Sequence, residues 1–242
     1  MKNIFDLIFS LIGLFFFLPV FIIVPLIIFL NDFGNPFYTP YRIGKRKKKF
    51  KMFKFRSMIL DADKNNVDST KNDDQRITMI GKIIRKFKFD ELSQLLNVIF
   101  GSMSLVGPRP NVEREVNMYS KEEIRILDVK PGITDFSSIV FADEGDILEG
   151  AHDPDLKYNQ IIRPYKSRLA ILYVEKKNLI LDIQLIFLTI LSFLNRKKAL
   201  NLLSNIVFKI SHDETLRKVC LRNDKLKPTA PPGFDKIITK RF

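Results

Sequence analysis

The feature that most constrains this chain is the run of apolar residues at its start. Residues 4–30 are dominated by Phe, Ile and Leu, and Asp6 is the only charged residue among them. As one helix the run would measure about 40 Å, more than the roughly 30 Å hydrocarbon core of a bilayer. It is longer than the apolar region of a signal peptide and lacks a small-residue cleavage site. The run therefore predicts a helix that enters a membrane.

Prolines and flanking charges indicate how this helix lies in the membrane. Pro19 and Pro25 each remove a helix hydrogen bond and favour a kink. Lys2 precedes the run, and the basic cluster at residues 45–49 follows it. Because positive charge prefers the cytoplasmic side, a re-entrant helix that bends at the prolines and returns satisfies both flanks. Hydropathy alone leaves a simple transmembrane anchor open as the alternative.

Charge and cysteine content narrow the class of partner. The 242 residues include 40 Lys and Arg against 27 Asp and Glu, which gives a net charge of +13. This excess predicts an anionic partner, whether nucleic acid, phospholipid head groups or a phosphorylated ligand. The single cysteine, Cys220, excludes an internal disulfide and, with only two histidines, argues against a structural zinc site.

The sequence FDELSQLLNVIFGSMSLVGPRP at residues 89–110 combines two acids with a rigidly held arginine. Its leucines recur at helical spacing, and Asp90 stands at the predicted helix start, where an N-cap carboxylate is favoured and stays ionised. The closing GPRP predicts a rigid loop that carries Arg109. Lys54 and Arg56 lie upstream. Carboxylates among fixed cations indicate a site for an anionic substrate such as phosphate, with a metal between the like charges.

Periodicity predicts several further elements. A half-buried strand is expected around Phe50, Phe53 and Phe55, and residues 61–75 are polar and expected to be partly mobile. Helices are expected at residues 77–87, 112–128, 179–194 and 202–210, and a short strand at residues 137–141. The helix at residues 179–194 is apolar but carries Asp182 and Gln184, which favours a position at the membrane interface over a span.

Taken in order, the motifs resemble those of the bacterial sugar transferase family, the monotopic polyprenyl-phosphate phosphoglycosyl transferases. The matching segments are RIG at 42–44, KFRSM at 54–58, RIT at 76–78, DELSQL at 90–95, NV at 97–98, Gly101, MSLVGPRP at 103–110 and KPGIT at 130–134. No single segment is specific, but the ordered set is. The chain departs from the family at Asp135, where a glycine is common, and at Ala170, where relatives often carry Asp.

The resemblance implies an α/β, helix-rich fold with a small catalytic domain on the membrane surface. We expect a re-entrant membrane helix over residues 1–31, the catalytic domain with interfacial amphipathic helices over residues 32–198, and a C-terminal extension of unknown role over residues 199–242. The expected location is the cytoplasmic face of the bacterial inner membrane.

The resemblance also implies a reaction. A sugar 1-phosphate would pass from a nucleotide diphosphate sugar, expected to be a UDP-sugar, to polyprenyl (undecaprenyl) phosphate, as the first membrane step of surface-glycan synthesis. Asp90 is the expected nucleophile and forms a covalent phosphosugar intermediate, Glu91 assists, and both hold Mg²⁺. Six cations are expected to bind substrate phosphates: Lys54, Arg56, Arg85, Arg109, Arg163 and Arg168.

The expected partners are the nucleotide sugar, polyprenyl phosphate and anionic membrane lipid, but not nucleic acid; a homodimer stays open. Two other functions compete with this interpretation. A membrane-anchored nucleic-acid-binding protein would explain the charge but leaves Asp90 and Glu91 without a role. A non-enzymatic scaffold with a decayed site would explain the departures at Asp135 and Ala170 but not the intact acids and cations.

Overall fold

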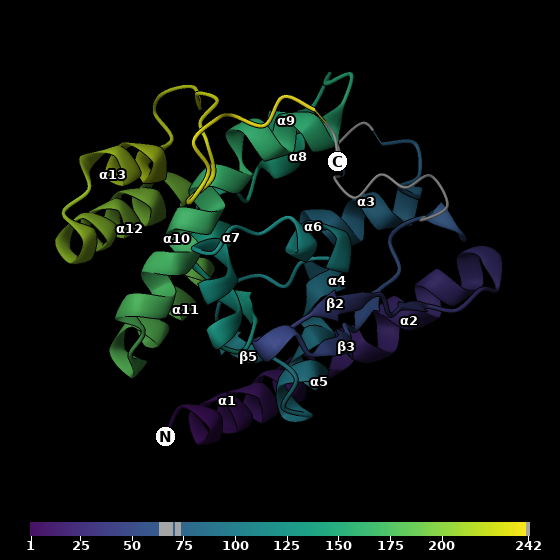
Figure 1. Ribbon diagram of the computed structural model, residues 1–242. Helices are drawn as coiled ribbons and strands as arrows, with labels where there is room; N and C mark the ends of the chain where they lie inside the picture. The colour runs from purple at the N-terminus through teal and green to yellow at the C-terminus, as the bar shows by residue number, and fades with distance from the viewer. Residues whose placement is uncertain (63–69, 71–73, 241–242) are drawn as a thin grey trace.

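The computed structural model describes residues 1–62, 70 and 74–240, which form helices around three two-stranded sheets (Figure 1). The α-helices are α1 (Lys2–Phe16), α2 (Leu18–Asp32), α3 (Met79–Lys86), α4 (Phe89–Leu92), α5 (Gln94–Ile99), α6 (Glu113–Asn117), α7 (Phe136–Val140), α8 (Glu144–Leu148), α9 (Pro154–Ile161), α10 (Arg163–Lys176), α11 (Leu179–Leu194), α12 (Arg196–Ser211) and α13 (Glu214–Leu221), with 3₁₀ helices η1 (Lys45–Lys47) and η3 (Glu123–Asp128). This helix-rich arrangement is compatible with the predicted α/β class.

The sheets are short and join distant parts of the chain. Strand β1 (Phe37–Tyr38) pairs with β4 (Lys54–Phe55), and β2 (Tyr41–Ile43) pairs with β3 (Lys49–Lys51), both antiparallel. Strand β5 (Ser104–Val106) runs parallel to β6 (Gly132–Thr134). A Cβ on Gly132 would lie 2.0 Å from the backbone nitrogen of Gly107. Glycine is therefore required where the loop after β5 crosses β6, and this crossing sets the course of the Arg109 loop.

The main apolar core lies among α7, α10, α11, α12 and α13. Phe136, Leu169, Leu185 and Leu203 are fully buried in it. Helices α12 and α13 share this core, so the first part of the C-terminal extension packs directly on the predicted catalytic domain. The domain boundaries after residues 31 and 198 stay predictions.

The N-terminal apolar run forms two helices with a bend of 61° between α1 and α2. The break falls at Phe17, which is not helical, and Pro19 occupies the first turn of α2. The prediction of a break at Pro25 was wrong, because α2 continues through Pro25 to Asp32. Among the described residues no single helix is long and apolar enough to cross a bilayer, whereas the bent pair α1–α2 passes that test as a unit.

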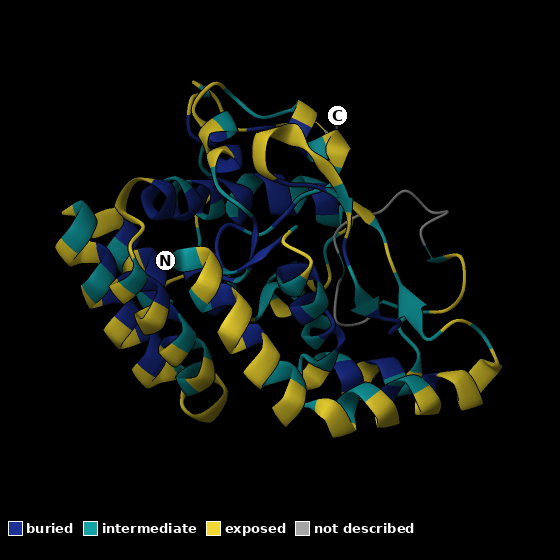
Figure 2. Ribbon diagram, turned by 90° about the horizontal axis from the view of Figure 1, so that it is seen from below, coloured by how far each residue is buried: buried dark blue, intermediate teal, exposed yellow. Residues whose placement is uncertain are grey.

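One face of the α1–α2 pair carries exposed apolar side chains. Figure 2 colours the exposed residues along these two helices yellow. They include Ile8, Phe15, Phe16, Ile22, Ile23, Leu26 and Leu30, each at least 48 % exposed. The opposite face packs on the rest of the protein, and its two buried polar residues are Asp6 and Ser10. Such continuous apolar exposure is far beyond what a surface in water carries.

Both ends of the bent pair are tied to the same body of the protein. At the start of α1, Lys2 Nζ donates to Val106 O at 3.1 Å and pairs with Asp182. Ser104 Oγ donates to Asp6 Oδ2 at 2.8 Å, so the only charge inside the apolar run is buried against β5. At the end of α2, Asp32 accepts from Arg56 Nη1 at 2.8 Å.

The structure corrects several local predictions. The segment at residues 137–141 is helical in α7 and not a strand, because Asp135 accepts from the Ser138 backbone nitrogen at 2.7 Å and caps a helix there. Residues 112–128 form two short helices, α6 and η3, rather than one helix. The predicted helix at residues 77–87 is shorter, as α3, and exposes Ile83. The segment predicted to be mobile, residues 61–75, lies mostly outside the described residues.

Other local predictions agree with the structure. The helices predicted at residues 179–194 and 202–210 are present as α11 and within α12. The strand predicted around residues 50–55 is present as two short strands, β3 and β4.

Candidate active site

One cavity of about 970 Å³ is lined by the two predicted catalytic acids and by four of the six predicted cations, Lys54, Arg85, Arg109 and Arg163. All of these except Arg163 come from four elements around the acids. Lys54 comes from β4 and Arg85 from the last turn of α3. Asp90 and Glu91 come from α4, and Arg109 comes from the loop after β5. The cavity is large enough for a nucleotide sugar, since ligand pockets measure about 300–1,000 Å³.

Asp90 is buried on the cavity wall with only 5 % of its surface exposed. Its Oδ2 lies 3.9 Å from Lys54 Nζ, and its Oδ1 has no hydrogen-bond partner among the described residues. Burial raises the pKa of Asp90, and the Lys54 cation opposes that rise. A buried carboxylate oxygen without a partner costs free energy, so this position is poised for an incoming group.

The predicted N-cap role of Asp90 was wrong. The residue that caps α4 is Lys88, in the left-handed backbone region, and Asp90 lies inside the first turn. The expected single helix is also interrupted at Ser93, between α4 and α5. The helix dipole therefore does not govern the ionisation of Asp90; burial and Lys54 do.

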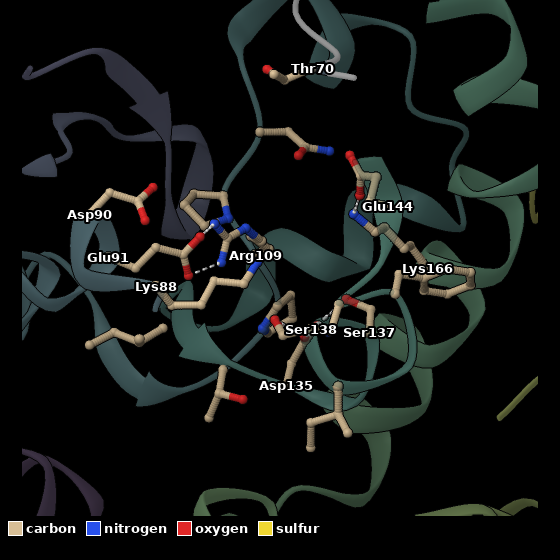
Figure 3. A pocket seen from close by; sticks show the side chains of 18 of the residues that line it. Thr70, Lys88, Asp90, Glu91, Arg109, Asp135, Ser137, Ser138, Glu144 and Lys166 are labelled. Atoms are coloured by element: carbon tan, nitrogen blue, oxygen red, sulfur yellow. Dashed lines mark hydrogen bonds and ion pairs between the residues drawn. The ribbon is translucent and has the colours of Figure 1, made fainter. Parts of the chain in front are cut away.

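Glu91 is held differently from its neighbour. Both of its carboxylate oxygens accept hydrogen bonds from the Arg109 guanidinium, in a bidentate pair drawn with dashed lines in Figure 3. Burial alone would raise the pKa of Glu91, but Arg109, helped by Lys54, holds it well below its usual range. Glu91 is thus ionised and fully engaged, whereas Asp90 is the acid with a free oxygen.

Lys54 and Arg85 complete the cationic side of the cavity. Burial lowers the pKa of each, against the attraction of Asp90. Lys54 does not form a hydrogen bond with Asp90, because the 3.9 Å between Lys54 Nζ and Asp90 Oδ2 is longer than a hydrogen bond. Partly desolvated cations of this kind bind phosphate oxygens strongly.

Three of the predicted phosphate-binding arginines are engaged elsewhere. Arg56 is 8 % exposed and pairs with Asp32 at the end of α2, away from the cavity. Arg163 reaches the cavity wall, but its three guanidinium nitrogens donate to Glu123, Asn159 and the Met118 carbonyl. Arg168 donates to the Ala230 carbonyl in the C-terminal tail at 3.1 Å. The structure assigns these three arginines to holding the fold together.

Residues that the sequence prediction did not select line the cavity across from Asp90. Glu144 and Lys166 form an ion pair there, with Ser137 and Ser138 beside them (Figure 3). Lys166 follows Arg163 by three positions and so shares its helix face, which is the one signal in the sequence that could have found it. Glu144 lies in the acidic, glycine-containing segment at residues 143–155, whose sequence suggests a part in sugar specificity without indicating a particular residue.

Asp135 and Ala170, where the chain departs from the family pattern, also line this cavity. Asp135 is buried and accepts hydrogen bonds from Ser137 Oγ and from Ser138 Oγ and backbone nitrogen. Asp135 therefore acts as the cap of α7, and its carboxylate is not available to a ligand.

The side chains of this cavity offer few oxygen ligands to a metal ion. In the part of the chain that the structure describes, no group of three or more His, Cys, Asp or Glu side chains could hold a metal ion by itself. Within residues 1–62, 70 and 74–240, Asp90 Oδ1 is buried without a hydrogen-bond partner, whereas both Glu91 oxygens accept from Arg109. A Mg²⁺ ion commonly takes one or two protein carboxylates and completes its shell with substrate phosphates and water. Asp90 together with a bound diphosphate fits that pattern.

Comparison with known proteins agrees with this geometry. Residues 1–196 match the family described as bacterial sugar transferase. The chain is 32 % identical over 206 residues to the exopolysaccharide production protein ExoY of Rhizobium meliloti. The matched residues cover 78 % of this chain and 83 % of that protein.

Two further relatives match over part of their length. A UDP-N-acetylgalactosamine-undecaprenyl-phosphate N-acetylgalactosaminephosphotransferase of Aeromonas hydrophila is 30 % identical over 78 % of this chain and 42 % of its own. A putative undecaprenyl-phosphate N-acetylgalactosaminyl 1-phosphate transferase of Bacillus subtilis is 44 % identical over 45 % of this chain and 61 % of its own. With the acids and cations gathered in one cavity, these matches favour an enzyme over a scaffold, and the chain belongs to the bacterial sugar transferase family.

Proposed function

We propose that this enzyme transfers a sugar 1-phosphate from a UDP-sugar to undecaprenyl phosphate, giving undecaprenyl-diphosphate-sugar and UMP. The observation that carries the proposal is the buried Asp90 carboxylate, with one free oxygen, in a cavity with Lys54, Arg85 and Arg109. The names of the Aeromonas and Bacillus relatives indicate the substrate classes. The product lipid would enter the synthesis of a surface polysaccharide.

The first step is attack of the Asp90 carboxylate on the phosphorus that carries the sugar. A new bond forms between carboxylate oxygen and phosphorus, the bridging bond of the diphosphate breaks, and UMP leaves with the electron pair. An oxygen of undecaprenyl phosphate then attacks the same phosphorus, and Asp90 leaves as a free carboxylate. Splitting the transfer in this way lets the soluble donor and the lipid acceptor occupy the site in turn.

The cations support this chemistry. Attack of an anion on an anion requires charge neutralisation, and Lys54 and Arg85 line the same cavity as Asp90, with Lys54 Nζ 3.9 Å from Asp90 Oδ2. The Arg109 guanidinium, oriented by Glu91, presents its remaining N–H groups toward the phosphates. Glu91 acts through Arg109 and is a positioning residue.

Mg²⁺ is the proposed cofactor. Asp90 and the donor diphosphate would hold it, since both oxygens of Glu91 are engaged by Arg109. When bound, Mg²⁺ neutralises phosphate charge during transfer. Turnover is expected to stop in excess EDTA and to return when Mg²⁺ is restored; full activity in EDTA would remove the metal from the proposal.

We also propose a monotopic position on the cytoplasmic face of the inner membrane. Lys2 and Asp32, at opposite ends of the α1–α2 pair, both bond to the same body of the protein, which favours a re-entrant path over a span. The exposed apolar face of the pair would enter one leaflet, and the basic cluster at residues 45–49 would contact anionic head groups.

A trapping experiment tests the nucleophile. With UDP-sugar labelled in the sugar and no lipid acceptor, the wild-type protein should retain one label on the peptide that carries Asp90, and UMP should be released in equal amount. Asp90→Asn should release no UMP above background and retain no label. Asp224→Asn, at an exposed position, is the matched control and should behave as wild type. Near-normal turnover of Asp90→Asn, or label on another residue, would refute the covalent route.

A further inference from the structure

The wall of the cavity opposite Asp90 holds polar side chains that the proposed reaction does not use. Glu144 begins α8, Lys166 lies in the second turn of α10, and Ser137 and Ser138 lie in α7. In Figure 3 the Glu144–Lys166 pair and the Glu91–Arg109 pair lie on opposite sides of the cavity. A substrate that reaches from one side to the other would contact both pairs.

The two sides differ in charge. Lys54, Arg85, Lys88 and Arg109 line the cavity around the carboxylates of Asp90 and Glu91, and Lys82 and Lys86 of α3 line it as well, so cations outnumber the two acids there. The Glu144–Lys166 pair is neutral as a unit. A diphosphate is therefore attracted to the Asp90 side, and the opposite side suits an uncharged polar group.

Hydrogen-bonding capacity points to the kind of uncharged group. The side chains of Glu144 and Lys166 are 29 % and 18 % exposed, so each can reach a ligand in the cavity. The Ser137 and Ser138 hydroxyls donate to Asp135, which leaves their oxygens as fixed acceptors. A carboxylate, an ammonium and two acceptor hydroxyls match a ring of hydroxyl groups, because each hydroxyl both donates and accepts.

The pair is held in place by its surroundings. Lys166 Nζ lies 5.2 Å from the centre of the Tyr158 ring. Asp143, next to Glu144, pairs with Arg196 at the start of α12 at 2.7 Å and with Arg222 just after α13 at 3.1 Å, so these two arginines anchor the start of α8. Side chains fixed in advance of binding discriminate between ligands better than mobile ones.

The sugar of the donor, rather than its nucleoside, is the group expected at this wall, because the sugar lies closer to the reacting phosphorus. The sugar is attached directly to the phosphorus that Asp90 would attack, whereas the ribose is one phosphate further away. Glu144 and Arg109 line the same cavity. A sugar ring therefore fits between the attacked phosphorus and this wall.

We propose that Glu144 and Lys166 form the sugar subsite of the donor, bind the ring hydroxyls and determine which sugar epimer is accepted. The proposal rests on the proposed function and names the part of the same cavity that selects the sugar. A site that hydrogen-bonds a substrate hydroxyl rejects an epimer strongly, because the wrong epimer leaves charged groups unpaired.

The test uses the full-length protein in detergent with two epimer pairs, UDP-glucose with UDP-galactose and UDP-N-acetylglucosamine with UDP-N-acetylgalactosamine. UMP release gives kcat and KM for wild type, Glu144→Gln and Lys166→Met. Glu149→Gln and Lys176→Met are matched controls at exposed positions of the same region. Competitive inhibition by UDP measures binding of the donor without its sugar.

The expected result is a rise of about tenfold or more in KM for the preferred donor in both site variants, with epimer discrimination reduced by a similar factor. The UDP inhibition constant and both control variants should stay within about twofold of wild type. A parallel loss of UDP affinity would assign the wall to the nucleoside, and unchanged discrimination would show no sugar contact; either result overturns the proposal.

The experiment separates this inference from the proposed function. If wild type released UMP from none of the four donors, the proposed function would fail at that point. The sugar subsite would then be tested by calorimetry, which measures the affinities of the same donors and of UDP for wild type and the two site variants. Weaker binding of the donors with unchanged binding of UDP in the variants would support the subsite.

Discussion

The buried ion pair between Arg163 and Glu123 gives the sharpest test of the structural assignments. Glu123 is fully buried and Arg163 is 2 % exposed. Arg163 Nη2 donates to Glu123 Oε2 at 2.8 Å, and Ser167 Oγ and the Ser120 backbone nitrogen donate to the same carboxylate. The Arg163→Met substitution would leave this carboxylate buried without a cation.

The expected cost is large. Removing one partner of a buried pair destabilises a protein by about 3–5 kcal/mol. For a chain of this size each kcal/mol lowers the melting temperature by about 2–4 °C, so a fall of about 6–20 °C is expected. Differential scanning fluorimetry of the protein in detergent measures this fall. Arg125→Met, which breaks the exposed pair with Glu175, is the matched control and should cost less than about 1 kcal/mol.

A double substitution separates stability from substrate binding. Glu123→Gln with Arg163→Met removes both charges and keeps one acceptor oxygen, for either the Ser120 N–H or the Ser167 hydroxyl, so at least half of the lost stability should return. Donor KM in this double variant should lie within about twofold of wild type. A melting temperature of Arg163→Met near that of wild type, or a tenfold rise in KM in the double variant, would refute the assignment of Arg163 to the fold.

Four further predictions concern Asp90, Lys54, Arg56 and Pro25. Because burial raises the pKa of Asp90, its ionised form at neutral pH opposes folding. The stability that this group contributes is fully present below its ordinary, unfolded pKa and is lost as pH rises through the raised folded pKa. Asp90→Asn should therefore melt at a higher temperature than wild type at pH 7 while losing activity, and a lower melting temperature would contradict this. Lys54→Met removes the cation that opposes the effect of burial, so the acid limb of the pH–kcat profile should move to higher pH in the residual activity, and movement to lower pH would refute the electrostatic account. Arg56→Met should reduce the free energy of unfolding by about 1–2 kcal/mol and so lower the melting temperature, because the contact with Asp32 is lost. Donor KM should stay within about twofold of wild type. A tenfold rise in KM would show instead that Arg56 binds substrate phosphate. Pro25→Ala should retain membrane association and the re-entrant path, because the bend lies at Phe17 and not at Pro25. The path is measured by the reactivity of single cysteines, placed at residues 3 and 35, toward a membrane-impermeant reagent. Labelling of these two positions from opposite sides of the membrane in this variant would show that the bend depends on Pro25.

The sequence alone determined the parts of this protein that depend on local pattern and residue chemistry. The apolar run at residues 4–30 required a helical, lipid-compatible segment, and α11 and α12 follow from periodicity over many residues. Asp90, Glu91, Lys54 and Arg109 were identified because acids and fixed cations in ordered motifs indicate an anion site. These features need no knowledge of distant contacts.

Only the tertiary structure decided which cations face the cavity. Arg56, Arg163 and Lys166 look equivalent in the sequence, but Asp32 lies 24 positions from Arg56 and Glu123 lies 40 positions from Arg163. Two further features depend on contacts that the local sequence pattern does not contain. They are the helix break at Phe17 and the helix, in place of a strand, at residues 137–141. A charged side chain goes to the partner that best compensates its burial, and that partner is set by how distant segments pack.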